Sequence, residues 1–201
     1  MYRLQKIDEL LLSSHQYLTP EDECFFFRSY TRLDLGFTKE NSFIMNFKKK
    51  MERKGKNDWK YKAQAILEAS DLFIQGTPPI NAPDVIFVPI PPSRMKGDPL
   101  YDDRNVQLIS NLCNAKPNGE LREIIYVNQN MPPTHEHKMS PDEMLPYLEV
   151  DEALCRDPKP NIVVVDDVIT EGAHFKACQG LLRQWFPNSR ITGLFIARTL
   201  H

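Results

Sequence analysis

Residues 161–178, NIVVVDDVITEGAHFKAC, carry the pattern that decides both the fold and the site. An apolar run ends in two adjacent acids, and a glycine precedes a segment with helical spacing. This pattern predicts a strand over Ile162 to Val165, an acidic turn, and a helix over Ala173 to Phe186. Open α/β sheets bind ligands beyond the carboxyl ends of parallel strands, and the free amides of a helix N-terminus attract phosphate. The stretch therefore predicts an anion-binding site beside Asp166 and Asp167.

The rest of the chain alternates strands and helices in the same way. Short apolar runs predict strands over Cys24 to Tyr30, Val85 to Ile90, Arg122 to Val127 and Ile191 to Ala197. Helical spacing predicts helices over Tyr2 to Leu12, Asn41 to Met51, Asp58 to Phe73 with Asp58 as its cap, and Asp103 to Cys113. Residues 128–160 hold six prolines and little periodicity, which predicts a long functional loop. The fold class is α/β, with a central, mainly parallel sheet flanked by helices.

Length and composition narrow the class of protein further. A chain of 201 residues is suited to one domain. A formal charge of −2 and a pI near 6.2 argue against a nonspecific nucleic-acid-binding protein, which needs a basic surface. We expect a cytoplasmic protein without membrane contact, because no segment approaches the roughly 20 apolar residues of a membrane helix and the first residues include acids. The four cysteines form no CxxC pair, so buried free thiols are expected.

The acidic motif resembles the PRPP-binding motif of type I phosphoribosyltransferases, where PRPP is 5-phosphoribosyl 1-pyrophosphate. The match runs from Val163 to Thr170 and includes Gly172. The resemblance implies that Asp166 and Asp167 are catalytic residues that hold the ribose hydroxyls. It further implies that the next seven residues wrap the 5′-phosphate: Val168, Ile169, Thr170, Glu171, Gly172, Ala173 and His174.

Two positions depart from the commonest form of this motif. Glu171 stands where a threonine is frequent, and a desolvated carboxylate facing a phosphate would repel it by several kcal/mol. We expect Glu171 to point outward or to reduce affinity. His174 either donates to the phosphate or packs on the first helical turn. An ordinary strand followed by a capped helix is the plainer alternative, but it leaves the repulsion between Asp166 and Asp167 unexplained.

Residues 85–110, VIFVPIPPSRMKGDPLYDDRNVQLIS, form a second informative segment. A strand followed by a Pro-x-Pro loop, basic residues and an arginine-led helix resembles the ComF-type branch of the family. This resemblance assigns the pyrophosphate to Ser93, Arg94, Lys96 and Arg104, and an arginine fork is suited to bind phosphate through two hydrogen bonds. A solvated loop is the alternative for Arg94 and Lys96. Asp102 and Asp103 either cap the helix and orient Arg104 or hold a divalent ion.

The ComF-type resemblance covers most of the chain at low identity. It continues through Tyr30, Phe47, Lys48 and the helix over Asp58 to Phe73. ComF-type proteins usually begin with cysteine pairs that can bind zinc, whereas this region has Cys24 alone. A role in DNA uptake therefore does not carry over.

Residues 128–139 occupy the place of the flexible flap of type I enzymes. Lys138 is the only cation of this segment. His135 and His137 would share one face of an extended chain, but two histidines without a third ligand make a weak metal site. No side chain is assigned as a metal ligand.

Together these features predict one domain, with residues 1–80 as an N-terminal elaboration or hood and residues 81–201 as the PRPP-binding core. The resemblance implies a phosphoribosyltransferase that uses Mg²⁺ and PRPP, transfers the phosphoribosyl group to a nitrogenous small-molecule acceptor and releases pyrophosphate. A non-catalytic sensor of PRPP or a nucleotide is the second hypothesis, and hydrolytic or toxic use of a nucleotide pool is the third. The sequence leaves open whether the protein forms a homodimer.

Overall fold

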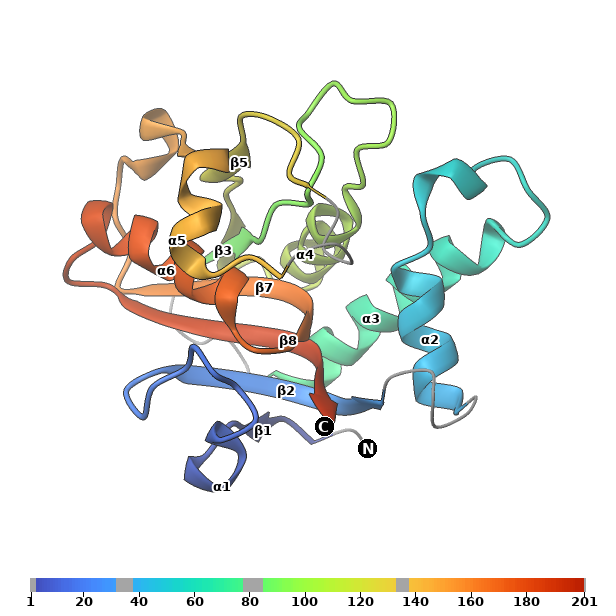
Figure 1. Cartoon of the computed structure of the whole chain (residues 1–201), viewed down its shortest axis with the longest axis horizontal. Coiled ribbons are helices and arrows are strands. Elements are labelled where there is room, and N and C mark those ends of the chain that lie inside the picture. The colour runs from blue at the N-terminus through green and yellow to red at the C-terminus, as the bar shows by residue number, and fades with distance from the viewer. Residues whose placement is uncertain (1–2, 32–37, 78–84, 133–137, 201) are drawn as a thin grey trace.

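A six-stranded sheet forms the centre of the molecule (Figure 1). The computed structural model describes residues 3–31, 38–77, 85–132 and 138–200, without the side chains of residues 39 and 40. Along the sheet, the strand order is β1 (Gln5–Lys6), β2 (Glu23–Thr31), β8 (Arg190–Leu200), β7 (Asn161–Ile169), β3 (Val85–Pro89) and β4 (Gly119–Leu121). Within the described residues only β1 runs antiparallel to its neighbour in this sheet. The predicted α/β class with a mainly parallel sheet is confirmed.

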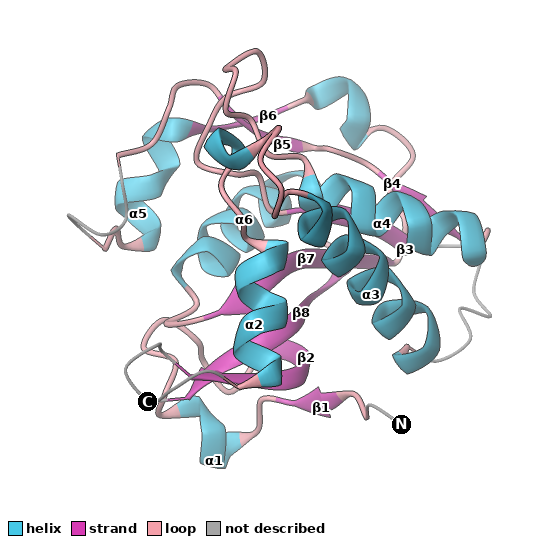
Figure 2. Ribbon diagram, turned by 90° about the vertical axis from the view of Figure 1, so that its right-hand side faces the viewer, coloured by secondary structure: helices cyan, strands magenta, loops and turns pink. Residues whose placement is uncertain are grey.

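Helices cover both faces of this sheet. The face turned to the viewer in Figure 2 carries α2 (Lys39–Phe47), α3 (Lys60–Gly76) and α4 (Arg104–Ala115). The opposite face carries α6 (Ala173–Trp185), which buries Phe175. Side chains of a strand alternate between faces, and in β3 Ile86 and Val88 join one core while Phe87 joins the other. The strand is thus buried on both sides, as predicted for a central parallel strand.

The connections change direction between β3 and β7. From β3 the chain passes through α4 to β4 on one side, whereas β7 pairs on the other side. The paired part of β3 ends at Pro89, opposite Val165, but β7 continues to Ile169 beside β8. The strand thus runs past Val165, where the sequence predicts its end. Asp166 and Asp167 lie on the part of β7 that has lost its β3 neighbour, at the kind of switch point where open α/β sheets bind ligands.

The N-terminal region contributes directly to the sheet. β2 pairs in parallel with β8, and α2 and α3 share a core with α4. The predicted strand over Cys24 to Tyr30 is confirmed, and the predicted helix over Asn41 to Met51 corresponds to α2, which ends four residues earlier, at Phe47. The predicted helix over Tyr2 to Leu12 is wrong, because β1 pairs with β2 and is followed by a short α1 (Glu9–Leu12). Strand pairing satisfies the backbone there, and a helix this short gains little by itself.

The prediction that Asp58 caps α3 is wrong. Trp59 is the residue before the helix, and it makes no side-chain capping bond. The Asp58 carboxylate instead pairs with Lys49 at 3.2 Å and with Arg53 at 2.8 Å. Nearby cations thus compete with the amides of the helix for this carboxylate.

Residues 119–160 contain more regular structure than predicted. The strand expected over Arg122 to Val127 is confirmed only in its second half, as β5 (Ile125–Val127). β5 pairs with β6 (Leu148–Val150) in a separate sheet, whereas β4, just before the expected range, belongs to the main sheet. Between β4 and β5, Arg122 is buried and its guanidinium donates to the backbone oxygens of residues 154, 156 and 157. The predicted long loop also holds short helical turns: α5 (Pro141–Met144), η3 (Leu145–Tyr147) and η4 (Glu152–Cys155).

The cysteines are free thiols, as predicted. Cys24, Cys155 and Cys178 are buried, and Cys113 is half-buried. Across the described part of the chain, no helix combines the length and apolar character needed to cross a membrane.

Candidate ligand-binding site

A cavity of about 460 Å³ lies at the carboxyl end of β7. Its walls come from the end of α2, the loop after β3, and the segment that joins β7 to α6. All seven residues of the predicted phosphate loop, 168–174, line it together with Asp166, Asp167, Ser93 and Arg104. Such a volume is typical of small-molecule pockets, so the fold gathers most of the predicted site into one cavity.

Among the described residues, the Asp167 carboxylate accepts four hydrogen bonds at this cavity. Asp167 is 2% exposed. One carboxylate oxygen, Oδ1, accepts from Nζ of Lys48 at 3.1 Å and from the amide of Val168 at 2.7 Å. The other, Oδ2, accepts from Nε and Nη2 of Arg104 at 3.0 and 2.6 Å. Burial by itself would raise the pKa of Asp167, but the charges of Lys48 and Arg104 outweigh it and hold the pKa well below its usual range.

A chain of ion pairs extends from Arg104 into the core. Nη1 of Arg104 donates to Oδ2 of Asp102 at 2.6 Å, and Nζ of Lys62 donates to the same oxygen at 2.8 Å. Lys62 is 4% exposed, and its ammonium also donates to the carbonyls of Phe47 and Lys49 at 3.0 Å each. Burial lowers the pKa of Lys62 although Asp102 opposes this. Asp102 therefore orients Arg104, which is one of the two roles considered for it.

Asp166 has different surroundings. Its Oδ1 accepts from Nδ2 of Asn105 at 3.0 Å and from the amide of Asp167 at 2.8 Å. No cation among the described residues pairs with it directly. Burial and the adjacent charge of Asp167 together raise the pKa of Asp166 to about 7. The pKa values of the two neighbouring carboxyls are thus shifted in opposite directions, a feature that is common at functional sites.

The predicted phosphate loop, residues 168–174, is held by hydrogen bonds from the segment that follows α1. The carbonyl of Thr170 accepts from Nδ1 of His15, and the carbonyl of Glu171 accepts from the amide of Tyr17 at 2.9 Å. Gly172 has φ of 91°, and a Cβ there would lie 2.8 Å from Cδ2 of Leu18. The loop is therefore held in place before any ligand arrives, while the first amides of α6 have no helical partner.

Glu171 and His174, the two departures from the commonest form of the motif, both line the cavity. The Glu171 carboxylate accepts a hydrogen bond from the ammonium of Lys138, and both residues line the cavity. The expectation that Glu171 points outward is therefore wrong, since its charge is compensated by an ion pair within the site. His174 is half-buried on the first turn of α6, where burial lowers its pKa. Burial therefore disfavours the protonated imidazole at this position.

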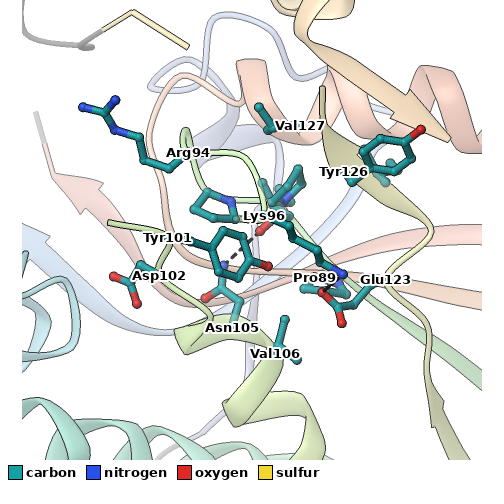
Figure 3. A pocket seen from close by; sticks show the side chains of 14 residues that line it. Pro89, Arg94, Lys96, Tyr101, Asp102, Asn105, Val106, Glu123, Tyr126 and Val127 are labelled. Carbon is teal, nitrogen blue, oxygen red and sulfur yellow. Dashed lines mark hydrogen bonds and ion pairs between the residues drawn. The ribbon is translucent and has the colours of Figure 1, made fainter. Parts of the chain in front are cut away.

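Arg94 and Lys96 do not line the large cavity. They line a neighbouring space of about 20 Å³, whose side chains Figure 3 shows. Lys96 pairs with Glu123 at 2.9 Å, and Arg94 lies 3.8 Å from Asp98 and points away from Asn105 (Figure 3). Of the four residues predicted for pyrophosphate, the structure thus brings Ser93 and Arg104 to the cavity, and it leaves Arg94 and Lys96 beside it.

Two residues of the site were not among those predicted to bind a ligand. Lys48 was noted only for its place in the ComF-type order, and its side chain is 44% exposed at the cavity. Asn105 follows Arg104 in the first turn of α4 and is 8% exposed. Neither position carries a sequence signal of its own, because each becomes part of the site only through the packing of α2 and α4 near the end of β7.

Comparisons with known proteins add no further assignment. The sequence matches no protein-family model, and no curated protein is similar enough to match it. Among the described residues, no three His, Cys, Asp or Glu side chains gather as a metal site. His135 and His137, considered for metal binding, lie outside the described residues.

Proposed function

We propose that this protein is a phosphoribosyltransferase of the type I fold, to whose central sheet the N-terminal region contributes β1 and β2. It binds PRPP and transfers the 5-phosphoribosyl group to a nitrogenous acceptor, releasing pyrophosphate. The observation that carries the proposal is the single cavity lined by Asp166, Asp167, Arg104, Lys48 and the start of α6. It combines carboxylates that suit sugar hydroxyls with two separate places for anions.

The two anion-binding places match the two ends of PRPP. The braced loop 168–174 ends at the N-terminus of α6, where unpartnered amides and the helix dipole favour the 5′-phosphate. Arg104 and Lys48, which both pair with Asp167, supply cations for the pyrophosphate. A carboxylate oxygen of the acidic pair would accept hydrogen bonds from the ribose hydroxyls.

The reaction forms one bond and breaks another at the anomeric carbon. The acceptor nitrogen forms the C–N bond, and the C–O bond to pyrophosphate breaks with its electron pair leaving on the pyrophosphate. The proton lost by the nitrogen passes to water. Arg104 and Lys48 stabilise the charge that develops on the leaving group, while the acceptor needs mainly to be positioned.

Mg²⁺ is the cofactor that this proposal implies. This ion keeps several waters and is usually held by one or two carboxylates together with substrate phosphates. Such binding does not need a cluster of three protein ligands, and the described residues contain none. Bound with PRPP, Mg²⁺ would offset charge on the pyrophosphate, and we assign it no protein ligand.

A second function is favoured by one observation. The ion pair of Glu171 with Lys138 places a carboxylate in the phosphate loop itself and neutralises a cation of the cavity. Both effects weaken phosphate binding, and a loop so arranged suits a protein that senses PRPP or a nucleotide without transferring it.

One experiment separates the two functions. The purified protein is incubated with PRPP, Mg²⁺ and a panel of nucleobases and amines, and pyrophosphate release is measured alongside PRPP binding by calorimetry. The transferase predicts release that depends on one acceptor. Binding without release under any condition supports the sensor, and absence of binding rules out both.

A further inference from the structure

The two carboxylates at the end of β7 differ in the bonds that they have already made. Both oxygens of Asp167 are in use, because Lys48 and the Val168 amide bond Oδ1 while Arg104 bonds Oδ2 twice. A sugar hydroxyl that approached Asp167 would compete with two cations for a side chain that is 2% exposed. Charge-assisted bonds are the stronger ones, so the hydroxyl would lose that competition.

Asp166 keeps one oxygen for a ligand. Its Oδ1 is occupied by Asn105 and by the amide of Asp167. Within the described residues, no hydrogen bond reaches Oδ2, and Asp166 lines the cavity. An ionised carboxylate oxygen offers two lone-pair sites, which is enough for two adjacent hydroxyls of a ribose.

Asn105 decides how Asp166 is oriented. Its Nδ2 donates to Oδ1 of Asp166 at 3.0 Å and to the carbonyl of Ile90 at 3.3 Å. The flipped amide would direct its oxygen at two acceptors, so the assignment of nitrogen and oxygen follows from the partners. With Oδ1 held in this way, the Asp166 carboxylate cannot rotate freely.

We propose that the two carboxylates perform different tasks. Asp166, oriented by Asn105, alone contacts the ribose diol, whereas Asp167 is a positioning residue that holds Arg104 and Lys48 toward the pyrophosphate. This assignment rests on the proposed binding of PRPP and refines it, because the resemblance by itself gives both acids the same role. Asn105 becomes a second positioning residue, for which neither the sequence motif nor the resemblance provides a role.

Two fragments of PRPP test the assignment separately. Ribose 5-phosphate carries the diol without pyrophosphate, and inorganic pyrophosphate with Mg²⁺ carries the leaving group without the diol. Calorimetry gives the affinity of each for the full-length protein. We expect Asp166→Asn and Asn105→Leu to weaken ribose 5-phosphate binding by about tenfold or more. The affinity of both variants for pyrophosphate should stay within about threefold of that of the unaltered protein. Asp167→Asn should show the reverse pattern.

The outcomes distinguish this inference from the proposed function. If the unaltered protein binds neither fragment, the proposed function fails. If it binds ribose 5-phosphate and Asp167→Asn loses that binding as strongly as Asp166→Asn does, both acids contact the diol and the division of tasks is overturned. Retained pyrophosphate affinity in Asp167→Asn overturns it as well.

Asp167→Asn leaves Arg104 with a weaker partner, so lost binding in this variant would also follow from a lost fold. A second variant separates these two causes. Lys48 is half-exposed, and Lys48→Met removes one of the two cations while both carboxylates stay in the chain and Arg104 still bonds Oδ2 of Asp167. We expect pyrophosphate affinity to fall by about tenfold while ribose 5-phosphate affinity stays within about threefold. An equal loss of both affinities would contradict the assignment. Thermal unfolding of each variant verifies that it is folded.

Discussion

The guanidinium of Arg104 donates two hydrogen bonds to a single oxygen of Asp167, from Nε at 3.0 Å and from Nη2 at 2.6 Å. Its remaining terminal nitrogen, Nη1, donates to Asp102 at 2.6 Å. Arg104 therefore links the end of β7 to the loop that precedes α4. Burial opposes its charge, but Asp167, Asp102 and Asp166 outweigh that effect and raise its pKa. The cation is permanent at any physiological pH.

Arg104→Lys should weaken pyrophosphate binding by about tenfold or more, because a lysine ammonium cannot reproduce a planar fork that serves two carboxylates and a ligand at once. Calorimetric titration with pyrophosphate and Mg²⁺ measures the change. Arg190→Lys is the matched control, since Arg190 pairs with Glu23 at the surface and does not line the cavity. Equal affinities in the two variants would show that Arg104 does not meet the ligand.

Gly172→Ala should destabilise the fold by about 1–2 kcal/mol from the left-handed backbone alone. The contact with Leu18 adds to this, because the new Cβ would lie 2.8 Å from Cδ2. Ribose 5-phosphate should also bind more weakly, since the loop must shift. Urea unfolding and calorimetry measure the two effects.

Gly180→Ala provides the control on the same helix. Gly180 is exposed within α6 and nothing lies within 4 Å of its Cβ position. Alanine should therefore stabilise the protein by about 0.5–1 kcal/mol through helix propensity. Destabilisation of similar size in both variants would contradict the special role of Gly172.

Asp166→Asn should change the pH dependence of stability. The carboxyl ionises near pH 4 in an unfolded chain but near pH 7 in the fold. Between these values the folded protein binds more protons than the unfolded chain. The stabilisation that comes from this group is therefore complete at low pH, falls as the pH rises, and is lost once the pH has passed 7. Asp166→Asn lacks that loss. Its free energy of unfolding, relative to that of the unaltered protein, should therefore rise by about 1 kcal/mol or more from pH 5 to pH 8.

Urea unfolding of both proteins at pH 5 and pH 8 tests this expectation. Burial lowers the pKa of His174, whose titration therefore acts in the opposite direction over part of the same range. Because His174 is common to both proteins, the difference between them isolates Asp166. A difference that does not change with pH would mean that Asp166 titrates at an ordinary value.

Glu171→Gln should tighten the binding of ribose 5-phosphate by about tenfold, because it removes a negative charge from the phosphate loop and releases Lys138 to the ligand. The gain should shrink at high salt. Glu149→Gln is the control, since Glu149 bonds Tyr126 and Asn128 outside the cavity. Unchanged or weaker binding in Glu171→Gln would place its carboxylate away from the phosphate.

The parts of the fold that the sequence predicts correctly are those with strong local patterns. The apolar runs of β2, β3, β7 and β8 and the periodic α4 and α6 lie where expected, because buried parallel strands and amphipathic helices each leave a periodic signature. The errors lie where contacts distant in the sequence decide. Residues 5–6 become a strand by pairing with β2, and β5 leaves the main sheet to pair with β6.

The candidate site divides in the same way. Asp166, Asp167 and the loop to His174 are contiguous, so their types and order are visible in the chain itself. Lys48 and Asn105 are 119 and 61 residues away from the acids that they bond. No local pattern could assign them, since their role depends on where α2 and α4 end.

By itself, the sequence determined the strand, the acidic pair and the glycine-led helix that surround the cavity, because each rests on local backbone preferences and hydrophobic period. Only the tertiary structure decided that Asp167 is enclosed by Lys48 and Arg104 while Asp166 keeps an oxygen toward the cavity. Two identical adjacent side chains acquire different chemistry because the end of β7 meets the cations of α2 and α4 at one carboxylate and an amide of α4 at the other. Charge and burial are properties of those surroundings, and the folded chain alone supplies them.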